Sequence, residues 1–341
     1  MNQIRFEIPI VLFIFKRIEK TAIIIDQISK IKPSKIYLIG DGPRNETEYS
    51  EVERCRKVAE EHINWDCILV KNYATENRGV YENIAGGAKW VFEKEEFAIF
   101  LEDDNFPELT FFRFCKEMLE KYDKDQRILW ICGTNYLQKY NPPDGSDYVF
   151  TKHMLPCGWA SWSDKFCKFY DGEFELLKHS DISNRLKHEC VDKQLYNHNK
   201  KTWDFEINLI NNGYKPHSWD YQMSFTIRVH GLLGIVPKFN LIQNIGVDNH
   251  SIHGGNSMSN IMTRRFCEIP VSELTFPIKH PLVCLVDPQF EKLTSKIIVP
   301  PLKYRLLGAI ISTIKKMFRI DANVSISKRI KSLFKIRTGI K

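Results

Sequence analysis

Three consecutive acidic residues, Glu102-Asp103-Asp104, are the part of the sequence best suited to chemistry. They directly follow the apolar run 97–101, so they fall where a buried strand is expected to end. Carboxylates crowded together repel one another unless a cation neutralises them. Their oxygens suit Mg²⁺ or Mn²⁺, which keep several water ligands and bind partly through substrate phosphates. The run predicts a divalent metal beside a diphosphate; a solvated acidic turn before the next helix is the alternative.

Polar residues also follow each of the three preceding expected strands. They are Lys16 and Arg17, then Asp41 and Gly42, then Asn77, Arg78 and Gly79. Because ligands bind beyond the carboxyl ends of parallel strands, all of these clusters should share one rim with the acidic run. There a carboxylate can accept from a ribose hydroxyl, a glycine permits close backbone approach, and an arginine suits a phosphate. Taken singly, each cluster fits an ordinary turn as well.

Apolar runs alternate with segments of helical periodicity up to residue 132. Strands are expected at 8–15, 35–40, 66–70, 97–101 and 128–132, and helices at 18–30, 46–63, 80–93 and 108–122. This alternation predicts an α/β fold with a twisted, mostly parallel sheet flanked by helices. Beyond residue 135 the pattern loosens into aromatic-rich loops and short helices. We therefore expect residues 1–135 and 136–299 to be two halves of one domain, and residues 300–341 to be a tail.

Two common nucleotide-binding motifs are absent from the sequence. No G-x-G-x-x-G follows the first expected strand, and no G-x-x-x-x-G-K-[ST] occurs anywhere. This argues against a dinucleotide oxidoreductase and against a P-loop NTPase. The pair Gly86-Gly87 lies inside an expected helix, where close packing explains it better than a phosphate loop does.

Taken together, the motifs resemble those of GT-A fold glycosyltransferases. The clusters Phe15-Lys16-Arg17, Asp41-Gly42, Asn77-Arg78-Gly79 and Glu102-Asp103-Asp104 resemble the nucleotide-sugar-binding half of that fold. The Glu-Asp-Asp form, the segment 155–162 and Trp219-Asp220-Tyr221-Gln222 are similar to motifs of the inverting N-acetylglucosaminyltransferase I group. Asn244-Ile245-Gly246, followed by His250 and His253, resembles the closing segment of many bacterial, family 2-like relatives. The likeness covers residues 8–255.

This resemblance implies a role for each matched residue. Asp104 would bind the metal together with a histidine, for which His253 is slightly preferred to His250. The nucleotide would be held by Arg17, Asp41, Gly42, Asn77, Arg78, Glu102 and Asp103. The sugar and acceptor pocket would be lined by Gly158, Trp159 and Trp219, with Trp162 left to the core. Asp220 would be the general base that takes the acceptor's proton, although relatives often carry a second acid where this chain has Tyr221.

The implied activity is metal-dependent transfer of a sugar from a nucleotide-diphosphate donor, foremost a UDP-sugar, to a glycan or lipid-linked hydroxyl. Such a reaction, with inversion, would serve bacterial surface polysaccharide synthesis. A sugar-1-phosphate nucleotidylyltransferase is one alternative, although that class usually has a Gly-rich loop where this chain has Phe15-Lys16-Arg17. A non-catalytic nucleotide-sugar-binding relative is another. Asp164 and Glu206 are further candidate acids, and a solvated face explains each equally well.

Charge is distributed unevenly along the chain. The net charge is +7, but residues 301–341 hold 11 basic residues against one acid, so the preceding 300 residues are mildly acidic. Basic residues interleaved with apolar ones at helical spacing predict a tail lying on an anionic inner-leaflet surface; a helix packed on the body is the alternative. A body without a positive cleft argues against nucleic acid. Nine cysteines without a C-x-x-C pair, and no leader-like segment, predict a cytoplasmic protein peripheral to the inner membrane.

Overall fold

The computed structural model describes residues 5–247, 258 and 261–318. The chain divides into two compact units, Met1–Ile298 and Val299–Lys341. This division falls one residue from the boundary expected between body and tail. Residues 1–135 and most of 136–299 belong to the same unit; their description as two halves of one domain stays a prediction.

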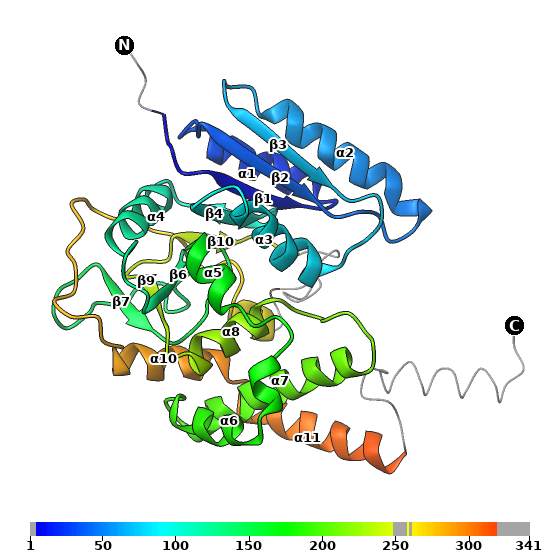
Figure 1. Cartoon of the computed structure of the whole chain (residues 1–341), viewed down its shortest axis with the longest axis vertical. Helices are drawn as coiled ribbons and strands as arrows, with labels where there is room; N and C mark the ends of the chain where they lie inside the picture. Colours follow the sequence, from blue (N-terminus) through cyan, green and yellow to red (C-terminus); the bar gives the residue numbers. More distant parts are fainter. Residues whose placement is uncertain (1–4, 248–257, 259–260, 319–341) are drawn as a thin grey trace, which may run out of the picture. The chain divides into compact units, whose positions relative to one another are not determined.

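An eight-stranded sheet in the described part of the chain forms the centre of the first unit. Its strand order is β3-β2-β1-β4-β8-β6-β9-β7, and Figure 1 shows β3, β2, β1 and β4 side by side. The strands are β1 (Ile10–Ile14), β2 (Lys35–Gly40), β3 (Ile68–Tyr73), β4 (Phe97–Glu102), β6 (Ile128–Cys132), β7 (Tyr148–Thr151), β8 (Trp159–Trp162) and β9 (Leu233–Pro237). Strands β1 to β4 are parallel, β9 is parallel to β6, and β7 and β8 are antiparallel to their neighbours. The prediction of an α/β fold with a mostly parallel sheet is confirmed.

The central strand β1 forms where the sequence is continuously apolar. All five of its residues are buried, because helices cover both faces of the sheet and leave no side for alternating polar residues. Four of the five expected strands recur within two residues of their predicted bounds. The fifth, β3, runs on to Tyr73 because its parallel pairing with β2 continues from Lys35↔Ile68 to Gly40↔Tyr73.

The expected looser half instead contributes three strands to the main sheet. The four-residue strand β8 lies between β4 and β6, and its Ala160 pairs with Ile99 on one side and Ile131 on the other. Such a strand is short and buried on both faces, so it shows no alternation in the sequence. A separate antiparallel pair joins β5 (Asn105–Pro107) to β10 (Ile242–Asn244).

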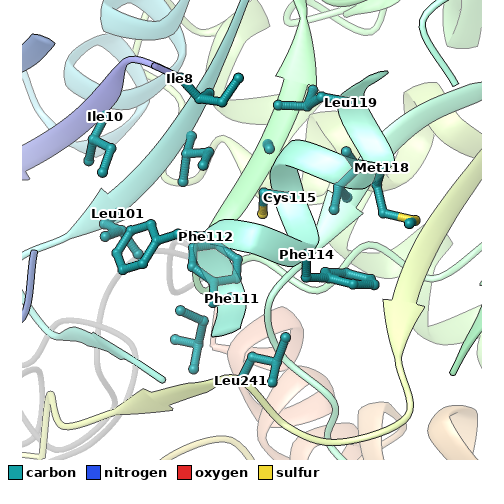
Figure 2. Close-up of a cluster of buried hydrophobic side chains, with 14 of the residues drawn as sticks. Ile8, Ile10, Leu101, Phe111, Phe112, Phe114, Cys115, Met118, Leu119 and Leu241 are labelled. Carbon is teal, nitrogen blue, oxygen red and sulfur yellow. The ribbon is translucent and has the colours of Figure 1, made fainter. Parts of the chain in front are cut away.

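Helices cover both faces of the sheet. One face packs against α1 (Ile18–Ser29), α2 (Glu46–His62) and α4 (Thr110–Lys121). The other packs against α3 (Gly87–Phe92), α5 (Ser163–Phe169), α8 (Asp220–Val229) and α10 (Pro288–Ile298). Figure 2 shows the apolar side chains of α4 gathered with Ile10 and Leu101 of the sheet. The amphipathic stripe on α4 comes from buried residues three and four apart, which lie on one side of a helix.

The expected helix over 80–93 is split into a π-helical turn, Glu82–Gly86, and α3. Gly87 lies against the sheet, since a Cβ there would approach Ile39 Cδ1 and Phe13 Cε1 to 3.0 Å. The interpretation of Gly87 as a close-packing glycine is confirmed.

Shorter elements surround this layered core. A satellite cluster centred on Trp203 and Phe225 joins α8 to neighbouring helices. These are η2 (Glu175–Lys178), α6 (Ser180–Arg185), η3 (Leu186–His188) and α7 (Lys193–Asn211). The short helix α9 (Ile261–Arg264) comes after the last strand in the chain.

The second unit contains α11 (Leu302–Met317). Within the described residues no lone helix has the length and apolarity to cross a membrane, and one bent pair, Pro288–Ile298 with Leu302–Lys315, passes by length and composition only.

Candidate active site

The acidic run lies where the strand order reverses. From β1 the chain adds β2 and β3 on one side and then returns to place β4 on the other side of β1. Glu102 is the last residue of β4 and pairs in register with Phe13 near the end of β1. Parallel α/β sheets bind ligands outside the carboxyl ends of the two strands at such a reversal. The candidate site is therefore at the β1–β4 switch point.

Arg17, just after β1, ties two of these acids together. Its Nη1 donates to Asp103 Oδ1 at 3.0 Å and to Asp104 Oδ2 at 2.5 Å. The amide of Phe15 also donates to Asp103 Oδ2, at 3.3 Å. The arginine and both carboxylates are largely shielded from water, with 16%, 8% and 12% of their side chains exposed. The expected contact between Arg17 and a phosphate stays a prediction, because in this structure the guanidinium donates to the two carboxylates.

Asp104 is further held by the segment that resembles a closing motif. The amide of Ile245 donates to the Asp104 carbonyl at 2.8 Å, following the antiparallel pairing of Asn244 with Asn105. A Cβ on Gly246 would come within 2.3 Å of Asp104 Oδ2, so any larger residue there would have to displace that carboxylate. The structure thus brings this predicted motif against the acidic run.

Asn105 is a site residue that the sequence reasoning missed. Its Nδ2 donates to Asp104 Oδ1 at 2.7 Å, and its Oδ1 accepts from the amide of Gly158 at 2.8 Å. Gly158 has a φ of +61°, and a Cβ there would clash with Ile242 at 2.5 Å. Asn105 therefore links the acidic run to the glycine-tryptophan motif. An amide directly after an acidic run is the only signal the sequence offers for it.

Burial raises the free energy of the ionised carboxylates at this site. It is the largest effect on Asp103, whose pKa is raised to about 6 even though the charge of Arg17 opposes the shift. For Glu102, burial and then the charges of Asp104 and Asp103 raise the pKa well above its ordinary value. A site that raises the pKa of carboxyl groups in this way gains when a further cation arrives.

Asp220, from the second half of the chain, lies within electrostatic range of the acidic run. It is the first residue of α8, and its negative charge is among those that raise the pKa of Glu102. Burial raises the pKa of Asp220 itself to about 6, while the amides of Asp220 and Tyr221 act in the opposite direction. Tyr136, which the sequence did not single out, also lies within range of this charge. A carboxylate titrating near neutral pH has the basicity of a general base.

Asp41 is engaged by the protein on both of its carboxylate oxygens. Oδ1 accepts from the amides of Gly42 at 2.8 Å and Arg78 at 2.6 Å. Oδ2 accepts from Asn77 Nδ2 at 2.8 Å and the amide of Gly79 at 3.1 Å. The structure thus brings the two predicted clusters together, with Asp41 shaping the turn. Their contacts with a nucleotide stay a prediction.

Two predicted pocket residues lie in the core. Trp159 is 1% exposed and stacks between Phe100, at 3.8 Å between ring centroids, and Trp130, at 4.2 Å. The prediction of a pocket wall at Trp159 is wrong, because both faces of its ring are covered. Trp219 is 3% exposed and packs against the same aromatic group, so its ring anchors the start of α8 instead of lining a pocket. Trp162 is also buried, as expected.

The metal prediction involves residues inside and outside the described part. His250 and His253 lie outside the described residues. Among the described ones, no three His, Cys, Asp or Glu side chains are arranged to hold a metal ion. Mg²⁺ commonly needs only one or two carboxylates together with substrate phosphates and water. The carboxylates of Asp103 and Asp104 are shielded from water and already pair with the guanidinium of Arg17. They fit a site in which the protein supplies two of the metal ligands.

No family model and no curated protein matches the sequence of this chain. Among solved structures, it is similar to a 4-diphosphocytidyl-2C-methyl-D-erythritol synthase from Anaerococcus prevotii, with 14% identity and a TM-score of 0.32 over 49% of this chain and 79% of that one. It is also similar to a UDP-glucose pyrophosphorylase complexed with UDP-glucose, with 9% identity and a TM-score of 0.32 over 70% and 93%. Both likenesses are too distant to bear on activity.

Proposed function

We propose that this protein is a metal-dependent glycosyltransferase of the GT-A type. It transfers a sugar from a nucleotide-diphosphate donor, foremost a UDP-sugar, to a hydroxyl of a glycan or a lipid-linked saccharide. The observation that carries the proposal is the meeting of Glu102-Asp103-Asp104, at the β1–β4 switch point, with the charge of Asp220 at the start of α8. The resemblance of the motifs to inverting transferases supports the same assignment.

The acidic run provides the donor half of the site. Asp104 and Asp103 are the carboxylates that would hold Mn²⁺ or Mg²⁺, with Glu102 beside them. When bound, the cation supplies Lewis-acid stabilisation to the leaving diphosphate. Arg17 donates to the same carboxylates and would offer a second positive charge to the phosphates.

Asp220 provides the acceptor half. Its carboxylate takes the proton of the acceptor hydroxyl while that oxygen attacks the anomeric carbon and the bond to the diphosphate breaks. Attack opposite the leaving group inverts the anomeric centre. With a pKa of about 6, Asp220 is mostly ionised at neutral pH yet remains basic enough to accept the proton.

The second unit is proposed to lie on the cytoplasmic face of an inner membrane. On α11 the apolar side chains of Leu306, Leu307 and Ile310 are more than half exposed. Lys303, Arg305 and Lys315 share the helix, and no acid occurs within Leu302–Met317. A basic helix with exposed apolar side chains suits anionic lipid. This placement fits a lipid-linked acceptor in surface polysaccharide synthesis and gives no role to nucleic acid.

Product analysis separates this proposal from its alternatives. A glycosyltransferase releases a nucleoside diphosphate from a nucleotide-sugar. A sugar-1-phosphate nucleotidylyltransferase instead releases pyrophosphate from a nucleoside triphosphate, and a binding relative releases neither. UDP- and GDP-sugars are first screened by thermal shift with Mn²⁺, because a bound donor raises the unfolding temperature. Pyrophosphate release from a triphosphate and a sugar-1-phosphate, without diphosphate release from any sugar donor, would overturn the proposal.

A further inference from the structure

Glu206 on α7 is a carboxylate that the proposed reaction does not use. Its side chain is 0% exposed, so the interpretation of Glu206 as part of a solvated face is wrong. Burial of a carboxylate costs several kcal/mol unless hydrogen bonds replace its water. Its Oε1 has no hydrogen-bond partner among the described residues. A helix that retains such a group needs a reason beyond its own stability.

The bond that Glu206 does make leads towards Asp220. Its Oε2 accepts the amide hydrogen of His217 at 2.8 Å, three residues before Asp220. Burial raises the pKa of Glu206, the amides of His217 and Ser218 lower it, and the charge of Asp220 raises it. Both amides belong to the turn that enters α8. Glu206 thus holds that turn from a different helix.

The rest of the turn is fixed as well. The Ser218 hydroxyl accepts from the amide of Asp220 at 3.3 Å, and the Tyr170 hydroxyl donates to the Trp219 carbonyl at 3.0 Å. The Trp219 ring is anchored in the aromatic core. Within this set, Glu206 supplies the charge-assisted bond, which is about twice as strong as a neutral one.

We infer that Glu206 is a positioning residue, which holds the turn 217–219 so that the Asp220 carboxylate meets the acceptor hydroxyl. The inference rests on the proposed role of Asp220 as the base. Glu206 touches neither reactant; it acts through the His217 amide. Misplacing a catalytic group by about 1 Å can slow a reaction roughly 100-fold, so a loosened turn should reduce turnover while the donor site around Asp103 and Asp104 still binds.

The test uses the full chain with UDP-N-acetylglucosamine and Mn²⁺ as the donor probe and water as the acceptor. Variants are Glu206→Leu, which removes the acceptor oxygen, and Glu206→Gln, which keeps one neutral acceptor. Glu291→Gln is the control for loss of a buried carboxylate, because Glu291 is 4% exposed and accepts the Lys152 amide; it faces His153 and, through it, Arg228 at the opposite end of α8 from Asp220. Release of UDP gives kcat and KM, and calorimetry with UDP gives donor affinity.

For Glu206→Leu, kcat should fall by roughly 10- to 100-fold with UDP affinity within about twofold of wild type. For Glu206→Gln, kcat should fall about threefold, since a neutral hydrogen bond partly replaces the charged one. The control should keep its kcat. An unchanged kcat in a folded Glu206→Leu, or equal losses in Glu206→Gln and Glu291→Gln, would overturn the inference.

Two further outcomes are assigned in advance. If Glu206→Leu does not fold, Glu206→Gln decides alone, and a kcat equal to wild type counts against the positioning role. Asp220→Asn is measured in parallel. If it turns over like wild type, the base assignment itself fails; if it is inactive while both Glu206 variants are fully active, only the positioning role fails.

Discussion

Replacing Arg17 with Met should expose how strongly the acidic run depends on a cation. The change keeps an aliphatic side chain and removes the guanidinium, whose Nη1 lies 3.0 Å from Asp103 Oδ1 and 2.5 Å from Asp104 Oδ2. Removing one partner of a buried ion pair typically costs 3–5 kcal/mol. Because the three side chains retain between 8% and 16% exposure, we expect the lower end, about 3 kcal/mol at pH 7.5.

The loss should depend on pH in a defined direction. Without Arg17 the pKa of Asp103, raised by burial to about 6 with Arg17 in place, should rise further. A carboxyl group with a raised pKa in the folded state binds protons more tightly there than in the unfolded chain. Its folded form therefore becomes more stable as pH falls through that pKa. The variant should thus recover part of its lost stability at pH 5.

Urea unfolding at pH 7.5 and pH 5 measures both effects. Arg185→Met is the matched control, since Arg185 pairs with Asp181 at 2.6 Å while 76% and 64% of the two side chains are exposed, and such exposed pairs contribute about 0–1 kcal/mol. Mn²⁺ with UDP, at about 100 times the dissociation constant, should return roughly 2.7 kcal/mol to the Arg17 variant. A loss no greater than that of the control, or one that is the same at both pH values, would refute the reasoning.

The remaining predictions concern the reaction, the metal, the closing segment and the tail. Asp220→Asn should keep UDP binding and lose most UDP release, and in wild type the rate should rise with pH through about 6 as Asp220 ionises; a retained acid limb in the variant would assign it to another group. Asp104→Ala should abolish the Mn²⁺ dependence of UDP binding measured by calorimetry, and unchanged coupling would remove Asp104 from the metal site. In Gly246→Ala the new Cβ would lie 2.3 Å from Asp104 Oδ2, so that carboxylate should move and Mn²⁺-dependent UDP binding should weaken by about tenfold, roughly 1.4 kcal/mol. The control Gly234→Ala, whose Cβ would have its closest contact at 3.5 Å, should leave binding unchanged. Removing Val299–Lys341 should stop flotation with phosphatidylglycerol vesicles and leave UDP release intact; equal flotation would place membrane binding elsewhere.

The fold of residues 1–135 could be predicted from the sequence because the strands there are apolar runs separated by helices. Runs such as 8–15 and 128–132 are the continuous apolar segments expected of strands that are buried on both faces. Strand β8 could not be found in this way. Its four residues are buried on both faces, and its antiparallel place between β4 and β6 depends on partners distant in the chain.

The candidate site was predictable only in part, for a similar reason. Strand ends reveal which polar residues share a rim, and that reasoning locates Asp104 and its neighbours. It does not reveal which side chains satisfy one another, so it assigned Asp41 to a nucleotide without showing that four protein donors already reach it. Residue type also misled at Trp159, because a sugar-binding wall and a core residue use the same ring. Asn105 emerges only from contacts across the fold, as does the contact that links Glu206, already a candidate acid, to the turn before Asp220.

Calorimetric titration of UDP into the full chain, with and without Mn²⁺, tests the central claim most directly. If Glu102-Asp103-Asp104 at the β1–β4 switch point forms a joint cation and diphosphate site, UDP should bind appreciably only when Mn²⁺ is present, with the same coupling seen when Mn²⁺ is titrated in the presence of UDP. Equal UDP binding in the presence and absence of Mn²⁺ and Mg²⁺, or no uptake of UDP, GDP or CMP with either metal, would contradict it.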